Sequence, residues 1–363
     1  MRVIILFLTL LASVNAYSQS DLTFSQAYQK FNQAYQANNL SERIKYGKIA
    51  YELGIEKYGE KAKTSYVLAL NWAVSLVEEN NRKSARKRVE LFQYVIEGYK
   101  TIYGQDSEKL IEPYIYYKQA IVAARPKEKR QYLQSVISGL EVINKKVEQG
   151  SLTQAYIAQV IADTYGKIGD AQTAGEWYQS SYDIYKEQLP ENDYRLGIAA
   201  FNMGKSSLRQ RSFYEAKQYF EQALLGFISE DGRNHKYELS TRAFLVSTLE
   251  KMGDSDEATE HVVALGKITP WKPNQRHQPL YRVQPRYPRK ALDKGIDGWV
   301  ALSFTISPTG NVEDIDVVES SNRLFEKPSK DALAKWRYAP KFVDGKAVKS
   351  EKLNVRLDFK RHN

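Results

Sequence analysis

Residues 161–185 read IADTYGKIGDAQTAGEWYQSSYDIY, and this stretch indicates the fold of most of the chain. Its pattern predicts a helix that ends at Tyr165 and a turn at Gly169-Asp170. A second helix follows, in which Ala174 and Tyr178 lie on the side that faces the first helix. Small residues let two helices approach closely, and an aromatic residue four positions away fills the groove between them. The stretch therefore predicts an antiparallel helix hairpin.

The same scheme recurs on both sides of this stretch. Ala174, Ala216 and Ala258 stand 42 residues apart, each at the equivalent point of a second helix. Toward the N-terminus, Tyr58-Gly59 and Tyr103-Gly104 end comparable helices 45 residues apart. Repeats of this length are the sequence signature of stacked hairpins. We therefore expect about twelve helices, arranged as six hairpins, between residues 21 and 267.

This pattern resembles the tetratricopeptide (TPR) repeat family, in the 42-residue version known from kinesin light chains. The match is clearest over residues 155–265. The resemblance implies an α-helical solenoid of TPR-like antiparallel hairpins with a concave face, and such arrays bind other proteins. We expect the many tyrosines to pack the hairpins together, and the basic run at residues 81–88 to be a solvated helix start.

Composition and motifs argue against an enzyme. The chain has no cysteine and only four scattered histidines, which excludes disulfides, thiol nucleophiles and Cys-ligated metals. The phosphate-binding patterns GxxxxGK[ST] and GxGxxG and the nucleophile elbow GxSxG are all absent. We therefore expect no enzyme activity, no cofactor and no metal. An exported hydrolase is the weakest alternative, because no carboxylate pair or catalytic triad has an identifiable setting.

The N-terminus reads as an export signal. Arg2 precedes an apolar run that starts at Val3 and ends in Val14-Asn15-Ala16, a pattern typical of a signal peptide cleaved after Ala16. The run is about 12 residues long, short of the roughly 20 that span a bilayer. We expect a signal peptide at residues 1–16 and a released mature chain. An uncleaved membrane anchor is the alternative.

After the helical region, residues 269–288 contain five prolines and predict an extended connector. Val300, Leu302, Phe304 and Ile306 then alternate with polar residues as in a half-buried strand. A turn at residues 307–310, a second strand at about 312–319, a helix carrying Trp336 and a last strand at 352–359 complete a β-β-α-β domain. The predicted order is a helical repeat domain at 17–268, a Pro-rich linker at 269–284 and a small α+β domain at 285–363.

The positive charge is concentrated in the last part of the chain. The net charge is +10, and residues 271–363 hold 19 Lys and Arg against 11 Asp and Glu, a net charge of +8. A basic end domain is compatible with nucleic-acid binding. However, basic and acidic residues alternate there, no Arg- or Lys-rich run is present, and the export signal leads outside the cytoplasm. We therefore expect no nucleic-acid partner.

Several spaced motifs stand in residues 279–360: Gln284-Pro285-Arg286-Tyr287-Pro288, Gly298-x-Val300, Phe304-x-Ile306-x-x-x-Gly310-x-Val312, Val318-x-Ser320-Ser321 and Trp336-Arg337-Tyr338-x-Pro340. In this order they resemble the C-terminal domain family of TonB, the periplasmic energy transducer of Gram-negative bacteria. The resemblance covers about a quarter of the chain. It implies a location in the periplasm, with an inner-membrane anchor facing the periplasm as the alternative.

The resemblance also implies a partner and a site. TonB domains bind the TonB box, a short extended segment of outer-membrane receptors for iron complexes and vitamins, which adds as a strand to the open sheet edge with the QPxYP region alongside. Carried onto this sequence, the expected partner-binding residues are Gln284, Pro285, Arg286, Tyr287 and Pro288, and Lys352, Leu353, Asn354, Val355, Arg356, Leu357, Asp358 and Phe359 of the last strand.

Two hypotheses for the whole chain follow. The sequence departs from the TonB pattern because it shows no evident transmembrane anchor and no long Pro-rich spacer, and the TPR-like array stands in their place. In the first hypothesis, the array docks an ExbB–ExbD-type motor complex or another TonB-system protein while the end domain holds a receptor during energised import. In the second, the chain is a scaffold without energy coupling, attached to peptidoglycan or another envelope component.

Overall fold

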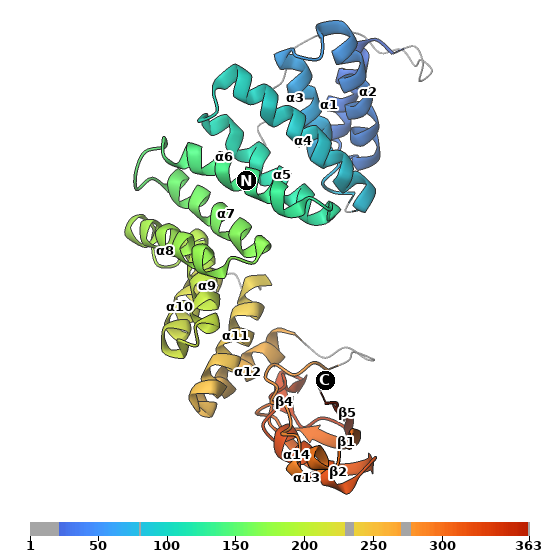
Figure 1. Ribbon diagram of the computed structural model, residues 1–363, viewed down its shortest axis with the longest axis vertical. Helices are drawn as coiled ribbons and strands as arrows, with labels where there is room; N and C mark the ends of the chain where they lie inside the picture. The colour runs from blue at the N-terminus through green and yellow to red at the C-terminus, as the bar shows by residue number, and fades with distance from the viewer. Residues whose placement is uncertain (1–21, 80, 229–235, 270–276, 362–363) are drawn as a thin grey trace. The chain divides into compact units, whose positions relative to one another are not determined.

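The computed structural model describes residues 22–79, 81–228, 236–269 and 277–361. The chain divides into two compact units, Met1–Ile184 and Tyr185–Asn363. Up to residue 269, the described ranges contain twelve α-helices, which confirms the expected number (Figure 1). They are α1 (Phe24–Gln36), α2 (Leu40–Tyr58), α3 (Lys63–Ser75), α4 (Arg82–Tyr103), α5 (Ile111–Ala124), α6 (Lys129–Asn144), α7 (Leu152–Ile168), α8 (Ala171–Gln188), α9 (Tyr194–Arg209), α10 (Phe213–Phe227), α11 (Lys236–Met252) and α12 (Ser255–Ile268).

In the first unit, each helix from α1 to α7 packs on its neighbours in the chain, as in a repeat protein. The buried side chains of α3–α7 form one core that includes Phe92, Leu133 and Ile161, and a second cluster around Phe31 lies between α1, α2 and α3. The hairpin predicted from residues 161–185 is present. Helix α7 ends at Ile168, three residues later than expected, its C-cap Gly169 has a φ of +91°, and α8 begins at Ala171. The hydroxyl of Tyr178 on α8 donates to Asp163 on α7 at 2.6 Å.

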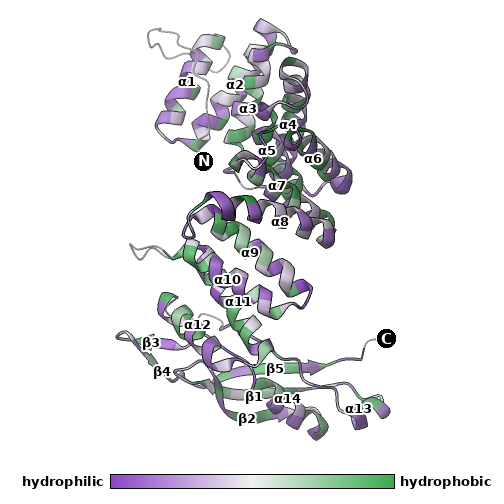
Figure 2. Cartoon of the chain, turned by 90° about the vertical axis from the view of Figure 1, so that its left-hand side faces the viewer, coloured by the Kyte–Doolittle hydropathy of each residue, from purple (hydrophilic) through white to green (hydrophobic). Residues whose placement is uncertain are grey.

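The small residues that the repeat depends on are all buried. Ala174, Ala216 and Ala258 each have 0% of their surface exposed, and Phe220 beside Ala216 is also at 0%. Figure 2 shows that the helices carry both hydrophobic and hydrophilic residues, as amphipathic packing requires. The alanines therefore stand where the sequence pattern placed them, at the contacts between helices.

The second unit contains α9–α12 and the small α+β domain. The elements of this domain are α13 (Arg289–Asp293), β1 (Gly298–Ile306), β2 (Val312–Ser320), α14 (Glu326–Leu333), β3 (Lys341–Val343), β4 (Lys346–Val348) and β5 (Leu353–Phe359). An antiparallel sheet of three strands has the order β2-β1-β5. The predicted strand–strand–helix–strand order is confirmed. The turn at residues 307–310 is confirmed as well, since Gly310 has a φ of +80° and its N–H donates to the Ser307 carbonyl at 2.9 Å.

The domain differs from the prediction in two additions, the short helix α13 and the hairpin β3–β4. Asp344 and Gly345 join β3 to β4 and have φ angles of +49° and +75°, the backbone that a two-residue hairpin turn requires. The sequence analysis did not predict these two strands, because three residues are too few for an alternating pattern to show.

The core of the α+β domain lies between the sheet and the helical segments. Val300, Leu302, Phe304 and Ile306 of β1 pack with Trp336 and Tyr338, which are 2% and 3% exposed. The indole N–H of Trp336 donates to the carbonyl of Val283 at 2.8 Å, so the segment before α13 is fastened to this core. Trp336 and Tyr338 thus close the core. The prediction of a helix that carries Trp336 is wrong, because α14 ends at Leu333 and Trp336 lies in the turn after it.

The predicted signal peptide, residues 1–16, lies outside the described residues, as does most of the first half of the predicted linker. Helix α12 ends at Ile268, and the described chain resumes at residue 277. No helix within the described ranges has the length and apolar character needed to span a bilayer. The proposed domain boundaries stay predictions.

The side chain of His261 on α12 predicts a dependence of stability on pH. Burial and the nearby Arg242, whose guanidinium is 3.4 Å from Nδ1, lower the pKa of His261 from 6.5 to about 4, while Glu257 opposes them. Between these two values the unfolded chain binds more protons than the folded one, so stability falls as the pH drops from about 6.5 to about 4.

We therefore expect the free energy of unfolding of the original chain to fall by up to about 3 kcal/mol more than that of His261→Gln across this pH range. Urea unfolding midpoints of the original chain and the variant, measured at several pH values, check this. Equal slopes against pH for both proteins would show that the pKa of His261 is the same in the folded and the unfolded chain.

Candidate functional site

Strand β5 is one edge of the three-stranded sheet. Its seven residues pair only with β1 among the described strands, in an uninterrupted register from Gly298 with Phe359 to Phe304 with Leu353. The backbone N–H and C=O groups on its other side therefore lack a strand partner. Such an edge is a template on which another extended chain can pair. The predicted strand, Lys352–Phe359, is confirmed except that it begins one residue later.

The side chains of β5 alternate between core and surface as predicted. Leu357 and Phe359 are 2% and 3% exposed, and Leu353 and Val355 are half-buried against the same core. The other set is exposed and lies on the opposite face of the sheet: Lys352, Asn354, Arg356 and Asp358. Since both sets project above or below the sheet, neither covers the free backbone of β5.

Ionic contacts order the exposed face of the sheet. Lys352 bonds Asp316 of β2 at 2.8 Å, and this hydrogen bond is the main cause that lowers the pKa of Asp316. Arg356 bonds Asp358 at 2.9 Å, and its guanidinium lies 4.2 Å from the ring centre of Trp299. The charged side chains near β5 therefore already have partners on their own sheet.

The QPRYP segment, residues 284–288, is divided between two roles. The ring of Tyr287 meets Phe325 and Phe359 edge-on, each at 5.8 Å between ring centres. Its hydroxyl donates to the Ile296 carbonyl at 2.6 Å. Tyr287 therefore brings the segment to the end of β5 and holds it there, with Pro285 and Pro288 half-buried.

Gln284 and Arg286 are exposed and face a different element. Together with α14 they line a cavity of about 500 Å³, which also includes Lys327, Asp331 and Lys335. The sequence analysis missed these helix residues as site candidates. The sequence signal that could have indicated them is the spacing of Lys327 and Asp331, one helix turn apart. In the structure these two side chains form an ion pair of 3.0 Å on an exposed face. The structure thus joins Tyr287 to β5 and groups Gln284 and Arg286 with α14. The part of all these residues in binding stays a prediction.

A second concave surface lies in the first unit, between α4 and α6. This cationic cleft has a volume of about 900 Å³. It is lined by Lys100, Gln105, Tyr114, Lys127, Glu128, Arg130, Gln131, Gln134, Ser135, Ser138, Gly139 and Val142. Three of these side chains are cationic and one is anionic. Burial raises the pKa of the Tyr114 hydroxyl, with the Lys100 ammonium opposing it, so this hydroxyl is a neutral hydrogen-bonding group at physiological pH.

No group of three or more His, Asp or Glu side chains is arranged to hold a metal ion in the part of the chain that the structure describes. The chemistry that both surfaces offer is hydrogen bonding and ion pairing with a polypeptide or another polar polymer.

Residues 283–360 match the family model described as Gram-negative bacterial TonB protein C-terminal. The TonB protein of Pseudomonas aeruginosa is 43% identical over 72 residues, which are 20% of this chain and 21% of that protein. The solution NMR structure of the P. aeruginosa TonB CTD is 37% identical and covers 25% of this chain and 92% of that chain, with a TM-score of 0.22. The crystal structure of BtubC (BKLC) from P. vanneervenii is 16% identical and covers 70% of this chain and 94% of that chain, with a TM-score of 0.49.

The chain spans about a fifth to a third of the length of the curated relatives it matches. The expected resemblance of the end domain to TonB is confirmed, and it concerns this domain alone.

The position of Tyr287 predicts how its substitution acts. Tyr287→Phe keeps the ring in place and removes the hydroxyl that bonds Ile296 and Asp297, which we expect to lower the local stability. Amide hydrogen exchange of β1 and β5, read by mass spectrometry, should become roughly 5-fold faster. Tyr214→Phe is the matched control, because Tyr214 is 66% exposed and the same change should leave exchange unaltered. Unchanged exchange in Tyr287→Phe would mean that its hydroxyl does not hold the segment.

Proposed function

With residues 283–360 established as a domain of the TonB C-terminal family, we propose that this chain is a TonB-like protein of the periplasm that binds outer-membrane receptors through this domain. An extended receptor segment, the TonB box, adds to β5 as a further antiparallel or parallel strand. The helical array docks a second protein, an ExbB–ExbD-type motor or another component of the TonB system. The chain thereby assists energised import.

The observation that carries this proposal is the unpaired side of β5. Its register with β1 is continuous over seven residue pairs, so the strand is straight enough to offer an even row of donors and acceptors. The polar side chains that project from its exposed face keep the empty edge soluble. The affinity for an added strand would come from main-chain hydrogen bonds.

The other edge of the sheet, β2, is far less suited to pairing. Its register with β1 shifts twice, between Ala301 and Leu302 and between Ser303 and Thr305. Asp314 within it has a φ of +49°, which interrupts the extended backbone. Bulges and inward-bent charged strands are the devices by which proteins block edge pairing. The two edges therefore differ, and the difference favours β5 as the receiving strand.

The cavity lined by Gln284, Arg286 and α14 would contact residues that flank the added strand. Its amide and guanidinium groups offer hydrogen bonds to a polar chain, and Arg286, Lys327 and Lys335 outnumber the single acid Asp331. An acidic residue beside the box would fit this cavity better than a basic one.

Proline substitution along β5 tests strand addition. Alternate N–H groups of β5 point to β1 and to the free side, so prolines from Leu353 to Asp358 should fall into two classes. One class should unfold the domain, and the other should abolish binding of a labelled TonB-box peptide while the domain still melts cooperatively. Asn354→Ala should cost about 1 kcal/mol or less, roughly a 5-fold change in Kd.

Val318→Pro, on the exposed β2 edge, is the control and should leave peptide affinity unchanged in any variant that melts cooperatively. Strand addition to β5 is wrong if every folded β5 proline variant binds the peptide as the original chain does.

The cationic cleft of the first unit supports the adaptor role of the array. Lys127 and Arg130 are exposed at its rim, and Gln131 and Gln134 offer paired donors and acceptors that match the backbone of an extended peptide. We propose that the partner of the array presents an acidic, extended segment to this cleft. Attachment to peptidoglycan, the alternative role, would place a glycan there instead.

Reversing the charge of the cleft separates these alternatives. The full-length double variant Lys127→Glu, Arg130→Glu should lose the salt-sensitive capture of an envelope protein in crosslinked cells, by at least about 10-fold. The control Lys83→Glu, Arg86→Glu makes the same charge change at exposed residues in the first turns of α4 and should keep the capture. Loss of binding to isolated cell wall, with protein capture intact, would contradict the adaptor role and favour the scaffold.

A further inference from the structure

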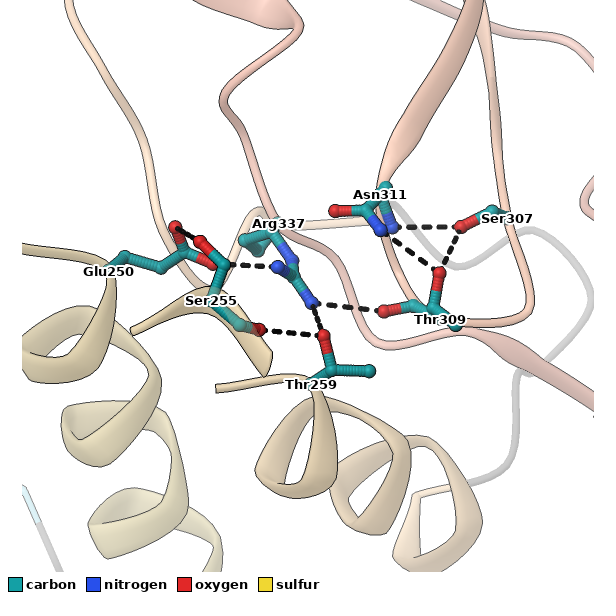
Figure 3. A network of polar contacts seen from close by, with 7 residues as sticks. All are labelled: Glu250, Ser255, Thr259, Ser307, Thr309, Asn311 and Arg337. Atoms are coloured by element: carbon teal, nitrogen blue, oxygen red, sulfur yellow. Dashed lines mark hydrogen bonds and ion pairs between the residues drawn. The ribbon is translucent and has the colours of Figure 1, made fainter. Parts of the chain in front are cut away.

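The small α+β domain and the last helical hairpin of the second unit meet in a shared contact, and Arg337 lies at its centre. Arg337 belongs to the WRYxP motif and its side chain is 4% exposed. Figure 3 shows its guanidinium between the two parts: one nitrogen bonds Glu250 of α11 at 2.7 Å, and the other bonds the Thr259 hydroxyl of α12 at 2.6 Å. The nitrogen that bonds Thr259 also donates to the Thr309 carbonyl oxygen at 3.1 Å.

The acceptors of Arg337 are themselves fixed. Ser255 donates to the second oxygen of Glu250 at 3.0 Å, and Thr259 donates to the Ser255 carbonyl at 2.8 Å. On the domain side, Asn311 donates to the Thr309 hydroxyl at 3.0 Å. A planar guanidinium with several donors fits such a set only in one orientation. The network therefore specifies how the domain sits on α11 and α12.

Apolar packing surrounds this network. Val246, Val262 and Leu265 of α11 and α12 form a buried cluster, and the partly buried Leu280, Tyr281 and Ala339 pack against it. The backbones also approach closely: a Cβ built on Gly266 of α12 would lie 2.7 Å from the Pro340 carbonyl oxygen. A Cβ on Gly310 of the domain would lie 2.2 Å from Val262. Glycine is thus required on each side of the contact.

We infer that the α11–α12 hairpin is a fixed mount for the TonB-like domain and that Arg337 is its positioning residue. The Thr309 turn that Arg337 contacts joins β1 to β2, and β1 is paired along its length with β5. A pull on a strand added to β5 therefore passes through β1 and this contact into α11 and α12. The α11–α12 hairpin sets the direction in which β5 is presented, which a flexible tether could not do. This inference rests on the proposed function only for the role of β5.

A pair of glycine substitutions tests the mount in the full chain. Gly266→Ala improves the helix propensity of α12 but drives a methyl group into Pro340. Gly166→Ala is the matched control, because this helical glycine of α7 has no atom within 4 Å of the built Cβ. Since the chain has no cysteine, spin labels can be placed at Tyr214→Cys on α10 and Val318→Cys on β2, both well exposed.

In the original chain we expect one narrow distance distribution between the two labels. Gly266→Ala should broaden it and lower the melting temperature, whereas Gly166→Ala should keep the distribution and raise or preserve the melting temperature. Glu250→Gln, which keeps the size of the side chain and removes its charge, should broaden the distribution as well. A broad distribution in the original chain, or a narrow one in both Gly266→Ala and Glu250→Gln, would overturn the mount.

Peptide titration of the same variants keeps the two proposals apart. The labelled TonB-box peptide should bind Gly266→Ala within about 2-fold of the original Kd, because β5 lies outside the altered contact. If the label distances contradict the mount while the peptide still binds, the mount is wrong and strand addition to β5 stands. A narrow distribution in a chain that binds no peptide supports the mount and contradicts the receptor role alone.

Discussion

A guanidinium group removed from water needs several hydrogen-bond acceptors and a compensating carboxylate, and Arg337 has them only where α11 and α12 meet the α+β domain. Two of its three acceptors come from the helical array and one from the turn of the domain itself. Separation of the two parts would break the Glu250–Arg337 ion pair and the hydrogen bond from Arg337 to Thr259. Loss of one partner of a buried ion pair is destabilising, because it leaves a charge without compensation. This contact therefore relates the α11–α12 hairpin to the sheet.

The sheet itself has two edges with opposite properties. The β5 edge is regular, while the β2 edge is bent by register shifts and by the positive φ of Asp314. The salt bridge from Lys352, the residue before β5, to Asp316 of β2 crosses the exposed face of the sheet. A sheet of only three strands thus has one edge suited to pairing and one that disfavours it, which would keep the proposed strand addition from turning into aggregation.

The QPRYP segment illustrates how one motif can hold residues of different kinds. Tyr287 packs against Phe325 and Phe359 and donates its hydroxyl to the backbone, so it belongs to the fold of the domain. Gln284 and Arg286 extend to the surface beside α14. The sequence analysis treated all five residues of the segment as partner-binding residues, as the resemblance to TonB implies. Alternation along an extended segment separates the two kinds, and only the packed core shows which set faces inward.

The sequence by itself determined the elements and their faces. The spacing of Ala174, Ala216 and Ala258 predicted buried helix contacts, and the alternation along β1 and β5 predicted which side chains enter the core; both are local patterns with the period of one element. The motifs of residues 279–360 predicted the family of the end domain. Tertiary structure alone decided which elements meet. Glu250 and Arg337 are 87 residues apart, and a proline-rich stretch between them predicted a connector rather than a contact. A periodic sequence pattern does not predict a contact across such a distance, because the contact depends on how two folded surfaces fit together.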